Sequence, residues 1–210
     1  MSSPKQLIEG FSRFRERHFA KDDALFRELV EQGQTPKTLV VACCDARVDP
    51  ALILDCAPGD LFVIRNVANL VPPAENQGHY HGTSAALEFG VRNLGVRNII
   101  VLGHAQCGGI HALLEGGVPK DDSFIAEWMG IAGAAREHVE QELAGVGDKA
   151  RQRACEQQAI LVSLNNLMTF SWIRERVEQG TLTLHGWYFD IENGQLLGYD
   201  VSTRQFAMLQ

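Results

Sequence analysis

Three continuous runs of apolar and β-branched residues constrain the fold of this chain most strongly. They are residues 38–44 (TLVVACC), 60–66 (DLFVIRN) and 97–104 (RNIIVLGH). Such runs are typical of strands that are buried on both faces of a parallel sheet. Helical patterns follow the second run at 82–95 and the third from 107 onward. We therefore expect an α/β fold with a mainly parallel central β-sheet flanked by helices.

The two ends of the chain carry other patterns. Residues 8–19 and 22–33 predict two amphipathic helices, which contain so few hydrophobic positions that we expect residues 1–33 to pack on a partner subunit. Residues 122–179 look helical, with a break at 144–149, and residues 181–203 predict a hairpin with an Asn-Gly turn. We interpret residues 1–210 as a single domain with a helical arm at 1–33.

Composition excludes several classes of function. The net charge of −7 gives no electrostatic footprint for nucleic acid. No apolar stretch approaches the roughly 18–20 residues of a membrane helix, and the first residues do not resemble a signal peptide. Five cysteines at irregular spacing form no disulfide framework. We expect a cytoplasmic protein that binds neither nucleic acid nor membrane.

Two strand ends together predict a metal site. Cys43 ends the first apolar run, His104 ends the third, and Cys107 opens the helix after it. Ligands of open α/β sheets bind beyond the carboxyl ends of the strands. Two thiolates and one imidazole suit Zn²⁺, and three protein ligands leave a position for water, which is the catalytic arrangement.

The residues around these ligands have natural roles in such chemistry. Asp45 would accept a hydrogen bond from a zinc-bound hydroxide, and Arg47 would hold Asp45 in its ionised form. Gly108 and Gly109 would offer backbone N–H groups to a developing oxyanion. If Cys43 faces the metal, strand alternation turns Cys44 away, so we expect Cys44 to be a buried packing residue. Cys56 and Cys155 are expected to be packing residues as well.

With these residues in hand, the chain resembles the β-class carbonic anhydrases. The matching stretches are ACCDARV, PGDLFVIRNVANLVPP, GTSAALEFGV and IIVLGHAQCGGIHALL. The resemblance implies a zinc enzyme that interconverts CO₂ and water with bicarbonate and a proton. It implies Cys43, His104 and Cys107 as zinc ligands and Asp45 with Arg47 as a catalytic dyad. Cys44 and Ala46 stand where the family usually has serines.

The resemblance also implies a substrate pocket. Gln34 matches a glutamine that lines the CO₂ pocket in the plant-like branch. Phe62, Val67 and Phe89 match its apolar wall, and the N–H of Gly108 matches a donor to a substrate oxygen. The family usually has tyrosine at the position of Phe89.

The other branch of the family has a closed form in which the aspartate ligates zinc. The tryptophan and the tyrosine that belong to that form are replaced by Val40 and Phe89 here, while Val48 and Arg65 remain. We therefore expect a constitutively open enzyme in which Asp45 does not bind zinc.

Several points stay open at this level. His79 and His81 are possible proton shuttles or ordinary surface histidines. Arg65 is either a structural link or a site residue. The family implies dimers, or tetramers and larger assemblies built from dimers. Alternative functions are a hydrolase of CS₂ or carbonyl sulfide on the same scaffold and a non-catalytic zinc-binding module.

Overall fold

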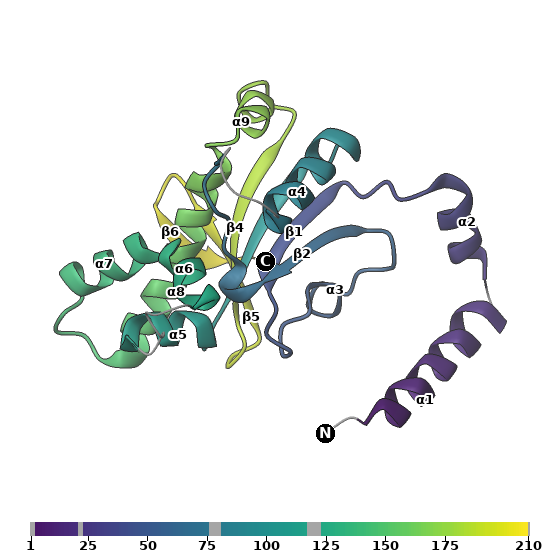
Figure 1. Ribbon diagram of the computed structural model, residues 1–210, viewed down its shortest axis with the longest axis horizontal. Helices are drawn as coiled ribbons and strands as arrows, with labels where there is room; N and C mark the ends of the chain where they lie inside the picture. The colour runs from purple at the N-terminus through teal and green to yellow at the C-terminus, as the bar shows by residue number, and fades with distance from the viewer. Residues whose placement is uncertain (1–2, 21–22, 76–80, 117–122, 210) are drawn as a thin grey trace. The chain divides into compact units, whose positions relative to one another are not determined.

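The computed structural model describes residues 3–20, 23–75, 81–116 and 123–209 (Figure 1). The chain forms two compact units, Met1–Thr35 and Pro36–Gln210. None of the described helices is both long and apolar enough to cross a membrane.

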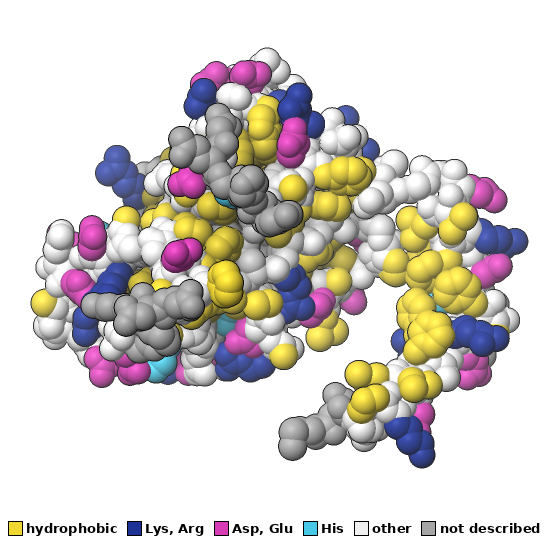
Figure 2. Space-filling model, in the orientation of Figure 1, with side chains coloured by type: hydrophobic (Ala, Val, Ile, Leu, Met, Phe, Trp, Pro, Cys, Tyr) yellow, Lys and Arg dark blue, Asp and Glu magenta, His cyan; other side chains and the backbone are white. Residues whose placement is uncertain are grey.

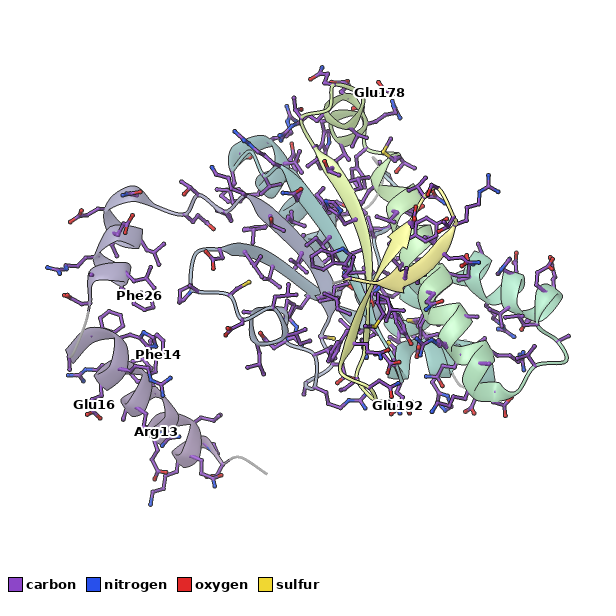
Figure 3. All side chains as sticks on the ribbon, turned by 180° about the vertical axis from the view of Figure 1, so that it is seen from behind. Arg13, Phe14, Glu16, Phe26, Glu178 and Glu192 are labelled. Carbon is purple, nitrogen blue, oxygen red and sulfur yellow. The ribbon has the colours of Figure 1, made fainter. Side chains whose placement is uncertain are left out.

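The first unit consists of helices with little core of their own. Helix α1 (Pro4–Arg15) begins at a capping box on Ser3, continues into a π-helical turn (Glu16–Ala20), and is followed by α2 (Ala24–Gln32). Phe14 and Phe26 point toward one another, with ring centroids 5.7 Å apart (Figure 3). No residue of either α-helix is buried.

Hydrophobic side chains gather along one side of both helices of this unit (Figure 2). Phe11 is 61% exposed and Val30 is 83% exposed. Both helices were predicted, and their apolar surface agrees with the expectation that this segment needs an outside partner. The partner itself stays a prediction.

The second unit is built on one six-stranded sheet, with strand order β2-β1-β3-β4-β5-β6. The strands are β1 (Thr38–Cys43), β2 (Leu61–Asn66), β3 (Asn98–His104), β4 (Thr183–Asp190), β5 (Gln195–Asp200) and β6 (Gln205–Met208). Strands β1 to β4 are parallel, and β5 and β6 are antiparallel to their neighbours. The predicted mainly parallel sheet is confirmed. The hairpin at the chain end is also present, and β6 extends it by a strand that the sequence patterns did not predict.

Seven α-helices are described in the second unit. They are α3 (Pro50–Ile53), α4 (Gly82–Glu88), α5 (Gly108–Glu115), α6 (Phe124–Gly130), α7 (Gly133–Glu142), α8 (Asp148–Leu167) and α9 (Ser171–Glu178). A 3-10 turn (Val67–Asn69) follows β2, and a π-helical turn (Phe89–Asn93) extends α4. The observed break between α7 and α8 spans residues 143–147, so the last two residues of the break predicted at 144–149 already belong to α8.

The two faces of the sheet are covered differently. On one face, Val41 and Val101 of the sheet pack in the main core with Leu87 of α4 and Ile160 of α8. Side chains of the opposite face, Val40, Ala42, Ile100 and Leu102, form a smaller buried cluster. The connections from β2 to β3 and from β3 to β4 cross the sheet in the same direction. Because such connections are right-handed, the helices that follow β2 and β3 lie on the same side of the sheet.

Helix α8 lies unusually close to the sheet. A Cβ added at Gly103 of β3 would lie 2.7 Å from Cδ1 of Ile160, and one added at Gly186 of β4 would lie 2.9 Å from its Cγ2. Real Cβ atoms do not come so close to other heavy atoms, so a larger residue at either position would force Ile160 or the strand to shift. This approach fixes how closely α8 lies against β3 and β4.

Candidate metal centre

The candidate site lies where the direction of the chain across the sheet reverses. Strands β1 and β3 are neighbours, but β1 leads to β2 on one side and β3 leads to β4 on the other. The carboxyl ends of two such strands border a crevice, the usual ligand position in open α/β sheets. Cys43 is the last residue of β1, His104 is the last residue of β3, and Cys107 precedes the first turn of α5.

The three predicted ligands come together at this crevice. One ligand atom from each of Cys43, His104 and Cys107 lies within 4.8 Å of the other two. All three side chains are buried, with exposed fractions of 5%, 1% and 1%. Two thiols and one imidazole at this spacing match the donor set of a zinc site with three protein ligands.

The two thiols influence each other's ionisation in opposite directions. The pKa of Cys43 is lowered to about 4, chiefly by a hydrogen bond with Cys107 and against the effect of burial. The same hydrogen bond, followed by burial, raises the pKa of Cys107 well above its usual range. The site therefore stabilises one thiolate by itself, and a second thiolate beside it requires a cation.

The imidazole of His104 supplies the third donor. Its Nδ1 lies 2.9 Å from the carbonyl oxygen of Ala105, which assigns the ring proton to Nδ1 and leaves Nε2 as the acceptor. Nε2 is buried and has no hydrogen-bond partner among the described residues. An unsatisfied buried acceptor costs about 1–3 kcal/mol. A metal ion between Nε2 and the two sulfurs would satisfy it, so the residues fit Zn²⁺.

Asp45 and Arg47 form a two-pronged ion pair beside this cluster. The Nε and Nη2 atoms of Arg47 donate to Oδ1 and Oδ2 of Asp45 at 3.0 and 2.6 Å, and the backbone N–H of Arg47 donates to Oδ1 at 2.9 Å. The side-chain hydrogen bonds from Arg47 hold the pKa of Asp45 well below its usual range. Nη2 of Arg47 also donates to the carbonyl oxygen of Gln106 at 2.9 Å. The pair thus connects the loop after β1 to the loop after β3.

Arg65 is a structural link within the chain. From β2, its Nε donates to the carbonyl oxygen of Cys43 at 3.0 Å and its Nη2 to that of Asp45 at 2.7 Å. Its Nη1 donates to Oδ2 of Asp49 at 3.1 Å. Arg65 therefore fixes the backbone that carries the first ligand and the ionised aspartate.

The residues predicted to line the substrate pocket belong to different elements of the second unit. Val67 packs against the buried cluster that contains Cys43 and Cys107. The rings of Phe62 and Phe89 are in contact, with centroids 5.9 Å apart. Gly108 is the first residue of α5.

The three other predicted site residues are Gln34, His79 and His81. Gln34 belongs to the first unit, so its role stays a prediction. His81 is exposed and lines a cleft with Val67 and Trp128, whereas His79 lies outside the described residues.

Cys44 corrects one expectation. It does not belong to the metal cluster, but it is exposed instead of buried. Cys44 is the first residue after β1; its backbone N–H still donates to the carbonyl oxygen of Asn66 at 2.8 Å, but its side chain is left uncovered. Cys155 is buried as expected, and Cys56 is half-buried.

The comparison with known proteins decides the family. A family model described as carbonic anhydrase matches residues 38–196. Beta carbonic anhydrase 3 of Arabidopsis thaliana is 35% identical over 197 residues, which cover 92% of this chain and 76% of that protein. The chain belongs to the β-carbonic anhydrase family.

Other β-carbonic anhydrases are similar to this one. The chloroplastic beta carbonic anhydrase 5 of Arabidopsis thaliana is 40% identical over 185 residues, which cover 88% of this chain and 60% of that protein. The solved structure of the β-carbonic anhydrase CcaA has a TM-score of 0.92 at 36% identity, over 98% of this chain and 92% of that one. A tetrameric β-carbonic anhydrase of Sordaria macrospora has a TM-score of 0.75 at 30% identity, over 92% of both chains.

Sequence reasoning missed several residues around the site of this β-carbonic anhydrase. Ala68, Asn69 and Gln106 have positive φ angles of 62°, 50° and 58°, a strained conformation for residues other than glycine. Glu156 of α8 accepts a hydrogen bond from the backbone N–H of Cys107 at 2.9 Å. A signal for Glu156 was present, because it falls on the stripe of buried α8 residues that includes Ile160.

Proposed function

We propose that this chain is a zinc-dependent carbonic anhydrase, a lyase that catalyses the reversible hydration of CO₂ to bicarbonate and a proton. The observation that carries the proposal is the buried set of Cys43, His104 and Cys107 with the ionised Asp45 beside it. When bound by these three side chains, Zn²⁺ supplies the Lewis acidity that brings the ionisation of a water molecule close to neutral pH.

Asp45 is suited to orient the attacking oxygen. An ionised carboxylate only accepts hydrogen bonds. Oδ1 already accepts two hydrogen bonds from Arg47, whereas Oδ2 accepts one. The free lone pair of Oδ2 can accept an O–H from the attacking oxygen, and this hydrogen bond directs the remaining lone pairs of that oxygen at CO₂. Arg47 is a positioning residue that keeps Asp45 charged and fixed.

The chain also offers groups to the substrate. The N–H of Gly108 belongs to the first turn of α5 and has no acceptor within the helix, so it can donate to a substrate oxygen. Phe62, Val67 and Phe89 supply apolar surface for CO₂, and Gln34 is assigned to the same pocket from the family resemblance. With phenylalanine at position 89, this pocket lacks a tyrosine hydroxyl.

We extend the proposal to the form and assembly of the enzyme. The two-pronged pair with Arg47 occupies Asp45, which supports an open, plant-like enzyme in which Asp45 is not a metal ligand. The exposed apolar side of α1 and α2 supports a homodimer, or a larger assembly built from dimers, in which these helices cover a partner. We place the protein in the cytoplasm.

The route of the product proton is assigned to His79 and His81. The unperturbed pKa of histidine, about 6.5, suits proton export near neutral pH. Replacing both residues with alanine should slow hydration in weak buffer and leave it nearly unchanged in concentrated buffer. If the double variant hydrates CO₂ as fast as the original protein in weak buffer as well as in concentrated buffer, these histidines are not shuttles.

The proposed function is tested by stopped-flow CO₂ hydration combined with metal analysis. The zinc-loaded protein should hydrate CO₂, lose activity with a chelator and regain it when Zn²⁺ is added back. A Cys43→Ala variant serves as the metal-free control. A zinc-loaded, folded protein without hydration activity would refute the proposal. Parallel assays with CS₂ and carbonyl sulfide address the alternative substrates, for which the comparisons give no support.

A further inference from the structure

Glu156 of α8 is a buried carboxylate that accepts a hydrogen bond from the backbone of the candidate ligand Cys107. Only 3% of the residue is exposed. Oε1 accepts from the backbone N–H of Cys107 and from Nε2 of Gln152, both at 2.9 Å. Oε2 accepts from the hydroxyl of Tyr188 at 2.8 Å. Three donors from three segments of the chain therefore surround one side chain.

Stability alone gives a poor reason for a carboxylate here. Burying an acidic group is costly unless it is paired, and an apolar side chain of similar size is often neutral or stabilising in its place. Among the described residues no cationic side chain forms an ion pair with Glu156, because the nearby Arg153 pairs with Asp190. The hydrogen bond to the ligand residue offers a functional reason instead.

That hydrogen bond supplies one acceptor that a capping box would otherwise provide. Cys107 is the N-cap residue of α5 and makes no side-chain capping hydrogen bond. In a capping box, a Glu or Gln at the third helical position accepts from the N-cap N–H. The third position of α5 is Ile110, which has no such group. Glu156 supplies the acceptor from another helix.

The same contact controls the direction of two site groups. Fixing the backbone of Cys107 fixes the origin of its thiol side chain and the first N–H groups of α5, including that of Gly108. Tyr188 is 0% exposed and stands opposite Gly103 in the sheet, one residue before the ligand His104. Through Tyr188, the carboxylate is held against the strand that carries the second ligand.

We propose that Glu156 is a positioning residue of the metal centre, which holds Cys107 in its ligating geometry through the backbone hydrogen bond. The inference rests on the proposed metal-dependent function. The partners of metal ligands typically contribute about 10–100-fold to metal affinity or activity. What matters is an acceptor at the correct reach, and not the negative charge.

Two conservative variants separate reach from charge. Glu156→Gln keeps the length of the side chain and an oxygen acceptor for Cys107 but removes the charge. Glu156→Asp keeps the charge but shortens the side chain by roughly 1.5 Å, so that it cannot serve Cys107 and Tyr188 together. Neither variant introduces bulk into the core.

Ser163 provides the matched structural control. It lies about two turns further along α8 and is 0% exposed. Its hydroxyl accepts from the N–H of Val71 at 3.2 Å and donates to the carbonyl oxygen of Asn69 at 3.4 Å, so it ties α8 to the segment after β2 and not to any of the three ligands. Ser163→Ala therefore measures the effect of losing a buried tie that does not involve Cys107.

The experiment measures Zn²⁺ and Co²⁺ affinity by competition with a chelator, and the thiolate charge-transfer band of the Co²⁺ protein. Glu156→Asp should lose about 10–100-fold in affinity and shift the band. Glu156→Gln and Ser163→Ala should stay close to the original protein in both readouts. Circular dichroism checks that each variant is folded.

Three results would overturn the inference. The first two are wild-type affinity in Glu156→Asp and an equal loss of affinity in Ser163→Ala. A loss in Glu156→Gln as large as in Glu156→Asp would equally reject it, because the charge would then be the cause. These readouts do not depend on hydration. Failure of the proposed function would instead show as a zinc-loaded original protein without CO₂ hydration.

Discussion

The close packing of α8 on the sheet is tested most directly at Gly103. A methyl group at this position would lie 2.7 Å from Cδ1 and 2.8 Å from Cγ1 of Ile160, whose side chain is completely buried. Ile160 belongs to the main buried core, so its side chain is surrounded by other core residues. Adding carbon to a well-packed core typically costs about 1–3 kcal/mol, and we expect Gly103→Ala to reduce the free energy of unfolding by that amount.

The cause of the loss can be isolated with a second substitution. Ile160→Ala removes both atoms that the new methyl group would meet, and by itself it should cost about 2–5 kcal/mol because it leaves a cavity. In the double variant the methyl group added at position 103 partly fills this cavity. The double variant should therefore be about 0.5–3 kcal/mol more stable than the sum of the two single losses predicts.

Urea unfolding at one fixed protein concentration measures all of these free energies. Gly133→Ala is the matched control, since no atom lies within 4 Å of a Cβ there. It should be neutral or stabilise the protein by about 0.4–1 kcal/mol. The close packing of α8 on β3 would be refuted if Gly103→Ala left the free energy of unfolding as little changed as Gly133→Ala. It would also be refuted if the losses of Gly103→Ala and Ile160→Ala were simply additive, because the two side chains would then not be in contact.

Three further predictions concern the site itself. Asp45→Ala should retain metal, because Asp45 lies outside the ligand cluster, but its rate of CO₂ hydration should fall about 10²–10⁴-fold. Metal content and stopped-flow rates measured on one preparation check this. Full activity would contradict the role of Asp45. Cys107→Ser should weaken metal binding itself, since the serine hydroxyl is a poor substitute for a thiolate; unchanged zinc content after dialysis against a chelator would exclude Cys107 as a ligand. The third prediction is a pH dependence. Arg47 lowers the pKa of Asp45 in the folded state, so the pair stabilises the protein above the ordinary aspartate pKa of about 3.9, and this contribution is lost as the pH falls through the lower, folded value. Arg47→Met should therefore be less stable than the original protein at pH 7, with a difference that shrinks below pH ~4; a difference that grows on acidification would contradict the sign of the shift.

The residue types along the chain were enough to predict the architecture of the sheet. The runs 38–44, 60–66 and 97–104 carry apolar side chains on consecutive positions, which only a strand covered on both faces can bury. Their order along the chain, with helices between them, limited the possible topologies to a parallel sheet. The ligand candidates followed because Cys43 and His104 end two of these runs, and strand ends of a parallel sheet meet at one edge.

Cys44 and β6 show where local patterns were insufficient. The alternation argument predicts only the direction of the Cys44 side chain, and not whether another element covers it. The N–H of Cys44 still donates to the carbonyl oxygen of Asn66 in β2 at 2.8 Å, so the exposure of Cys44 depends on tertiary packing and not on the residue alone. In the same way, Gln205–Met208 becomes a strand because β5 offers it an open edge.

The sequence by itself thus determined the sheet, the three metal ligands as candidates, and the aspartate and arginine beside them, because each of these follows from residues that are close together or at strand ends. Only the tertiary structure decided what surrounds them. Glu156 is 49 residues from Cys107, and their hydrogen bond exists because two glycines allow α8 to approach β3 and β4. The buried stripe of α8 marks Glu156 as an inward-facing position, but its partner cannot be predicted from that local pattern, since the contact depends on how closely two distant elements pack.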